Sequence, residues 1–89
     1  MIVPNFTFDA DVNGYISEPI TIDEKASAVI ELASRAPVVT LKQIKEGEFA
    51  NFGQTPKSGT HFQINITCKK ESIIRLATPV EVKKCYILN

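Results

Sequence analysis

The residues with the most reactive side chains in this sequence are one histidine and two cysteines, His61, Cys68 and Cys85. A thiolate activated by an imidazole base is the nucleophilic pair that such residues could form. From His61 to Cys68, however, apolar and polar residues alternate, which predicts a β-strand. His61 and Cys68 then lie on opposite faces of that strand. We therefore expect no catalytic pair and no enzyme activity.

Both cysteines lie in apolar, strand-like stretches, where a free thiol behaves as a small hydrophobic group. We expect two buried thiols and no disulfide, which favours a reducing compartment and a cytoplasmic location. The sequence has no Cys-x-x-Cys pair and no second histidine, so it lacks the ligand spacing of a structural zinc site. We expect neither a metal nor a cofactor.

Two further segments suggest ligands. The composition of residues 53–59 predicts a loop, with Lys57 inside it, but the order of residues is not that of a phosphate-binding loop. Weak anion binding by exposed amides and Lys57 stays open. Asp9 and Asp11 share the polar face of an N-terminal strand and could meet a cation, but charges on an edge hairpin commonly serve solubility, so we expect no metal there.

The elements that carry these residues fit a single domain over residues 1–89. Ten basic and ten acidic side chains give a net charge of zero. No apolar stretch approaches the length that crosses a membrane, and the N-terminus lacks the pattern of a secretion signal. We therefore expect no contact with a membrane.

The N-terminal third predicts a hairpin followed by a helix. Residues 5–22 alternate in the manner of two strands around an Asn13-Gly14 turn of type I′, with an interruption at Pro19. Residues 23–36 predict an amphipathic helix, because Thr21–Glu24 resembles a capping box and Pro37 would end the helix. Four residues recur along one helical face, namely Ala26, Val29, Ile30 and Ala33.

The remainder predicts four or five short antiparallel strands separated by turns. One of these segments, residues 69–77, fits a short helix as well, since Ile73, Ile74 and Leu76 match both periods. The predicted fold class is α+β and β-rich: a hairpin, one helix and a small antiparallel barrel or curled sheet.

Three stretches of the C-terminal half carry a resemblance: Leu41–Phe49, Gly59–Phe62 and Ala77–Val82. This part of the chain resembles compact SH3-like β-barrel proteins, many of them encoded by phages, which open with a turn of the form Leu-x-x-Ile/Leu-x-x-Gly followed by Phe. The resemblance implies a barrel. It implies almost nothing about function, because the functions of those proteins are mostly unassigned.

Charge is divided unevenly along the chain. Residues 1–37 carry six acidic and two basic side chains, a net charge of −4, whereas residues 38–89 carry eight basic and four acidic ones, a net charge of +4. Such asymmetry indicates an interaction surface. One hypothesis is that the basic half binds single-stranded nucleic acid through aromatic and cationic side chains, namely Lys45, Phe52, Lys57, His61, Lys69 and Lys70.

The favoured hypothesis is a small regulatory or assembly module that binds a protein partner or a second copy of itself, and an inhibitor of the phage type is one form of this hypothesis. The hairpin and the predicted helix would form its contact surface, with Asp9, Asp11 and Glu18 as the partner-binding residues. An edge strand of this kind pairs readily with another sheet. Domains of this size often gain stability by forming homodimers.

Overall fold

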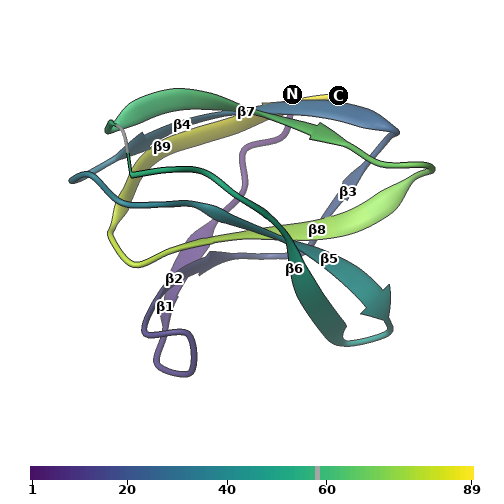
Figure 1. The fold of residues 1–89 in the computed structure, drawn as a ribbon, viewed down its shortest axis with the longest axis horizontal. Coiled ribbons are helices and arrows are strands. Elements are labelled where there is room, and N and C mark those ends of the chain that lie inside the picture. Colours follow the sequence, from purple (N-terminus) through teal and green to yellow (C-terminus); the bar gives the residue numbers. More distant parts are fainter. Residues whose placement is uncertain (58) are drawn as a thin grey trace.

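Nine β-strands make up the regular structure of residues 1–57 and 59–89, the part of the chain that the computed structural model describes. They are β1 (Phe6–Asp9), β2 (Gly14–Ser17), β3 (Ile20–Ile22), β4 (Lys25–Leu32), β5 (Val39–Lys45), β6 (Glu48–Gln54), β7 (His61–Thr67), β8 (Ser72–Thr78) and β9 (Val82–Leu88). One sheet has the order β1-β2-β8-β5-β6, with β3 pairing the other end of β8, and a second sheet has the order β7-β4-β9. All the pairings are antiparallel, and the two sheets face each other (Figure 1).

The helix predicted over residues 23–36 is wrong, because this segment contains β4, the central strand of the smaller sheet. Burial along β4 alternates strictly: the side chains of Ala26, Ala28, Ile30 and Leu32 are buried, whereas those between them are partly exposed. The sequence fits both periods, but pairing with β7 on one side and β9 on the other satisfies the backbone and selects the strand. The fold is therefore all-β over the described residues.

The predicted capping box is a crossover between the sheets. Asp23 and Glu24 connect β3, in the larger sheet, to β4 in the smaller one. The carbonyl oxygen of Glu24 accepts a hydrogen bond from the Cys68 amide at 2.7 Å, and the Asp23 amide donates to Asn89 Oδ1 at 3.1 Å. The single small barrel of four or five strands is likewise corrected to two packed sheets. The alternative helix at residues 69–77 is the strand β8.

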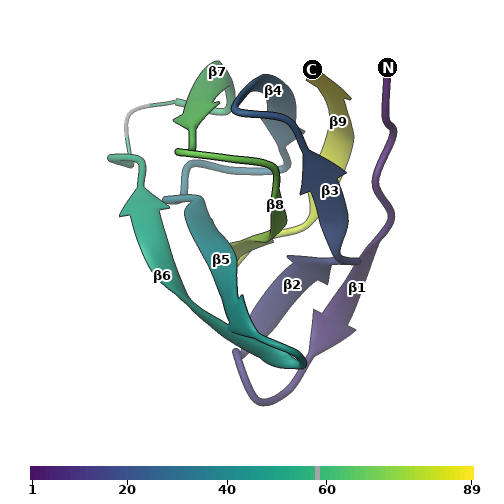
Figure 2. The same ribbon diagram turned by 90° about the vertical axis from the view of Figure 1, so that its right-hand side faces the viewer.

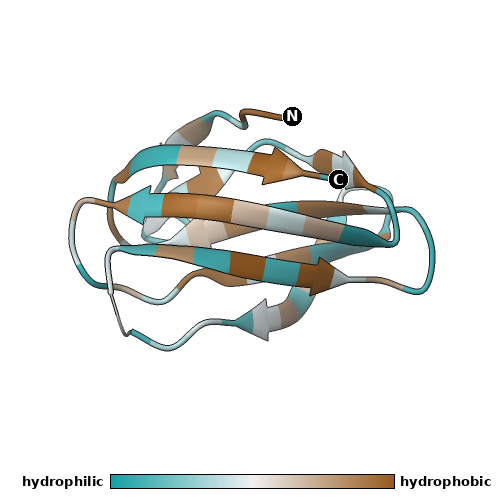
Figure 3. Cartoon of the chain, turned by 90° about the horizontal axis from the view of Figure 1, so that it is seen from above, coloured by the Kyte–Doolittle hydropathy of each residue, from teal (hydrophilic) through white to brown (hydrophobic). Residues whose placement is uncertain are grey.

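The core fills the space between the two sheets. Along β8, alternate residues point inward, and Ile74 and Leu76 are completely buried. Ile30 and Ile87 meet them from the smaller sheet and are also completely buried. Alternation of hydrophobic and hydrophilic residues is visible along β7 of this sheet (Figure 3). One face of each sheet is thereby buried, as two-layer β architecture requires.

The hairpin and the interruption at Pro19 are confirmed. Strand β2 ends at Ser17 and β3 begins at Ile20, and both pair with β8. Where the strand breaks, the buried hydroxyl of Ser17 accepts a hydrogen bond from the Leu76 amide at 2.9 Å and donates to the Glu18 carbonyl at 2.9 Å. The Ser17 hydroxyl thus gives the Leu76 amide the hydrogen-bond acceptor that it lacks where the strand is interrupted.

The hairpin turn differs from the type I′ turn that we predicted. Asp9 pairs with Gly14, so four residues form the loop, and Asn13 alone among these residues has a positive φ, of 51°. Gly14 is needed for a different reason. A Cβ atom at this position would lie 2.6 Å from the carbonyl oxygen of Thr78 and 2.9 Å from Cα of Pro79.

We expect Gly14→Ala to lower the free energy of unfolding by roughly 1–3 kcal/mol, because a methyl group there overpacks against backbone atoms that cannot move aside easily. Gly53→Ala is the matched control, since a Cβ at Gly53 meets no atom within 4 Å. Urea denaturation followed by circular dichroism measures both. Equal losses in the two variants would contradict this assignment.

Candidate functional site

The two cysteines are free and buried, which confirms the expectation of buried thiols. Burial raises the pKa of the Cys85 thiol from its ordinary value of 9.0 to about 11. His61 is exposed at the start of β7, across from Glu31 of β4, whereas Cys68 belongs to the core. The structure does not bring His61 and Cys68 together as a nucleophile and a base.

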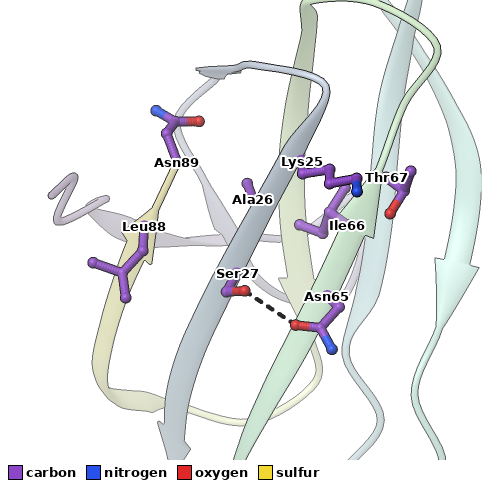
Figure 4. A pocket seen from close by; sticks show the side chains of 8 residues that line it. All are labelled: Lys25, Ala26, Ser27, Asn65, Ile66, Thr67, Leu88 and Asn89. Carbon is purple, nitrogen blue, oxygen red and sulfur yellow. Dashed lines mark hydrogen bonds between the residues drawn. The ribbon is translucent and has the colours of Figure 1, made fainter.

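A shallow hollow of about 280 Å³ lies on the smaller sheet near Lys25 and Thr67 (Figure 4). Within it the Ser27 hydroxyl donates to Oδ1 of Asn65 at 3.0 Å. Nε2 of Gln63, outside the hollow, donates to the same oxygen at 3.0 Å. An amide oxygen is not a base at neutral pH, so this contact does not activate the hydroxyl as a nucleophile. The hollow offers a polar surface.

The acidic residues predicted to bind a partner all lie on or beside the hairpin, but two of them serve the fold locally. Oδ1 of Asp9 accepts a hydrogen bond from the Asp11 amide at 2.8 Å, which closes an Asx turn in the loop. Oε1 of Glu18 accepts from the Asn5 amide at 3.2 Å and ties down the segment that leads into β1. Among residues 1–57 and 59–89, no group of three or more possible metal ligands gathers.

The hairpin carries apolar side chains that are exposed. Phe8 is 60% exposed and packs edge-on against Tyr15, with ring centroids 5.6 Å apart, and Val12 is 45% exposed. Met1 and Val3 are exposed as well. The hairpin extends away from the smaller sheet (Figure 1), so the alternation in its sequence is not matched by an opposing layer.

The residues predicted to bind nucleic acid are spread over several loops. Lys45 forms an ion pair with Glu48 at 3.5 Å in the β5–β6 turn, Lys57 lies in the loop after β6, and His61 begins β7. Lys69 and Lys70 lie in the β7–β8 turn. These residues do not form one cluster.

One aromatic residue of this group does lie beside a cation. Nζ of Lys42 lies 5.3 Å from the ring centroid of Phe52, and Lys42 also shares a hollow with Lys70 and Glu71. Lys42 was not among the predicted site residues. Its pairing with Ile74 places it on the inward side of the sheet near the sheet's end, a position that only the register reveals.

A groove separates the edge strands of the two sheets. It has a volume of about 510 Å³, and its walls come from β6 with the residues that follow it and from β7. Phe52, Ile64 and Ile66 give it an apolar side, whereas Gln54, Gln63 and Asn65 are polar. Figure 2 shows β6 and β7, the strands that border the groove, on the same side of the two sheets.

The acidic and basic halves of the chain are interleaved in space. Strand β4, from the acidic half, lies between β7 and β9 of the basic half, and β8 lies between β2 and β5. The opposite charges of the two halves therefore do not form two separate lobes.

No protein-family model, no curated protein and no solved structure matches this chain. Among the described residues, no helix is long and apolar enough to cross a membrane.

The raised pKa of Cys85 predicts a pH dependence of stability. The Cys85 thiol ionises near pH 9 in the unfolded chain, whereas in the folded protein it stays protonated to about pH 11. The stability that the folded protein gains from the protonated thiol is therefore complete below pH 9 and is lost as the pH rises toward 11. We expect Cys85→Ala to lose less stability than the wild type between these values. Urea denaturation of both proteins at pH 8 and above pH 10 compares them. Parallel pH profiles would contradict the prediction.

Proposed function

We propose that this chain is a non-enzymatic protein-interaction module, with a regulatory or assembly role, that binds through its N-terminal segment and hairpin. One observation carries the proposal: four of the seven large hydrophobic side chains exposed among the described residues, Met1, Val3, Phe8 and Val12, lie in the first twelve positions. Exposed apolar groups that gather in one region are typical of a contact surface. The free, buried thiols support a reducing compartment such as the cytoplasm.

The backbone of β1 offers a means of contact. The Glu18 amide donates to the Asn5 carbonyl at 3.1 Å, and bonded pairs alternate along an antiparallel ladder. The amide and carbonyl groups of Phe6 and Phe8 therefore point away from β2, toward the free edge of the sheet. A strand from a partner would find unpaired groups there.

A second copy of the chain is the partner that this edge fits directly. If two β1 strands pair antiparallel with the two-fold axis at Thr7, Phe6 of each copy lies opposite Phe8 of the other. This self-complementary pattern is that of a two-fold dimer. In that register Asp9 meets Asn5 of the second copy, so no two carboxylates are opposed. The exposed ring of Phe8 would become covered.

The alternative, binding of single-stranded nucleic acid by the basic residues, is supported by Lys42 over Phe52 and by the nearby Lys70. It receives less support than the protein interaction. Lys45 is paired with Glu48, and Phe52 is the single aromatic side chain among the described residues that line the groove.

We expect the double variant Phe8→Ser/Val12→Ser to raise the dimer dissociation constant about tenfold or more, because both apolar side chains lose the contact that shields them from water. Sedimentation velocity over a wide range of protein concentration measures this constant. Addition of a fluorescent single-stranded oligonucleotide at low salt tests the alternative in the same experiment.

Ile44→Ser is the matched control, since Ile44 is 65% exposed on the β5–β6 hairpin, outside the proposed surface. This control should leave dimerisation unchanged. A wild-type chain that stays monomeric at every concentration would contradict the dimer, and oligonucleotide binding that disappears at high salt would favour the alternative.

A further inference from the structure

Strand β7 forms an edge that lacks the usual protection against pairing. It runs for seven residues in unbroken register with β4, and it contains no lysine and no proline. Natural edge strands are commonly blocked by such residues, by bulges, or by being short. Two other edges are less open: β6 has two irregularities in its pairing with β5, and β9 is bridged by Ile2.

Two hydrogen bonds fix which backbone groups of β7 are free. The Cys68 amide donates to the Glu24 carbonyl at 2.7 Å, and the Leu32 amide donates to the Thr60 carbonyl at 2.7 Å. The two residue pairs joined by these bonds continue the β4–β7 register at its two ends. In an antiparallel ladder, hydrogen-bonded pairs recur at every second position. Phe62, Ile64 and Ile66 therefore bond to β4. The amide and carbonyl groups that point to the open edge belong to His61, Gln63, Asn65 and Thr67.

The facing strand supplies the other side of the groove. The Thr55 amide donates to the Val38 carbonyl at 3.0 Å, so these two residues form a hydrogen-bonded pair. Because bonded and non-bonded pairs alternate along an antiparallel ladder, the amide and carbonyl groups of the next residue, Gln54, point away from β5. Gln54 and Gln63 both line the groove, with Ile64 and Ile66 on its inner side. A chain lying along β7 would therefore meet apolar side chains at every second position.

The end of the groove near Thr67 is cationic. Lys69 and Lys70 follow in the β7–β8 turn, and Lys42 lies over Phe52, which lines the groove. Glu71 is the acidic residue beside Lys42 and Lys70, so positive charge remains in excess there. This charge is complementary to an acidic segment.

We propose that the groove between β6 and β7 binds an extended segment of a partner protein, which adds to β7 as an antiparallel strand. Its acidic residues lie at its N-terminal end, beside Lys42, Lys69 and Lys70, and apolar residues follow at the positions opposite Ile64 and Ile66. Main-chain hydrogen bonds to β7 provide affinity, while the charged end and the apolar positions provide specificity. This site is separate from the hairpin, and its occupation does not depend on dimerisation.

The test uses a blocked peptide as long as β7, with two acidic residues followed by alternating valine and threonine. It is titrated into the full-length, ¹⁵N-labelled protein. We expect shifts and slower hydrogen exchange at the amides of His61, Gln63, Asn65 and Thr67. Two control peptides, one N-methylated at alternate positions and one with lysines in place of the acidic residues, should bind about tenfold more weakly or worse.

Variants of the protein separate the two contributions. Gln63→Pro removes an outward-facing amide, whereas Gln63→Ala keeps it, so only the proline variant should weaken binding about tenfold. Lys69→Glu/Lys70→Glu keeps the backbone of β7 and should weaken binding of the acidic peptide by a similar factor. Lys83→Glu/Lys84→Glu, on exposed positions of β9 at the opposite edge of the smaller sheet, is its charge-matched control.

Several outcomes would overturn the proposal. No change at the four outward amides at millimolar peptide would exclude strand addition. Equal binding by the N-methylated peptide would show that main-chain hydrogen bonds are not the source of affinity. If an oligothymidylate shifted the same groove in a salt-dependent manner while the acidic peptide did not, the groove would be a nucleic-acid site.

Discussion

The double pairing of β4 determines the rest of this structure. Its backbone bonds to β7 on one side and to β9 on the other, so Ala26, Ala28 and Ile30 are held in a row against the larger sheet. Two small alanines allow close approach of the layers, and isoleucines from β8 and β9 fill the remaining space. Because β4 takes the central place, β7 becomes an edge with one row of unpaired backbone groups. The proposed groove follows from this arrangement.

Local patterns in the sequence identified most of the strands. The alternation at residues 61–68, the break at Pro19 and the burial of both cysteines follow from side-chain periodicity and from the missing amide of proline. The strand at residues 25–32 could not be identified from periodicity, because two patterns coexist there. Ala26, Val29, Ile30 and Ala33 match a helix, while Ala26, Ala28, Ile30 and Leu32 match a strand. The partners that decide between these periods lie thirty or more positions away in the sequence.

The candidate sites were less accessible to sequence analysis than the strands. Most of the predicted binding residues are charged. Of these, Asp9 and Glu18 instead stabilise the turn and the N-terminal segment, and Lys45 is paired with Glu48. Phe8 and Val12 fit an apolar face in the sequence and are exposed because no second layer covers the hairpin. The groove depends on which strands become edges, and no local pattern encodes that. The register between β5 and β8 places Lys42 beside the groove, where it lies over Phe52.

Amide hydrogen exchange along β4 and β7 tests the central claim most directly. We expect slow exchange throughout Ser27–Ile30 and an alternating pattern in β7, with Ile64 and Ile66 protected and Gln63 and Asn65 exchanging fast. Fast exchange in β4, or equal protection at all four positions of β7, would contradict this claim, because β4 would not then be the central strand or β7 would not have a free edge.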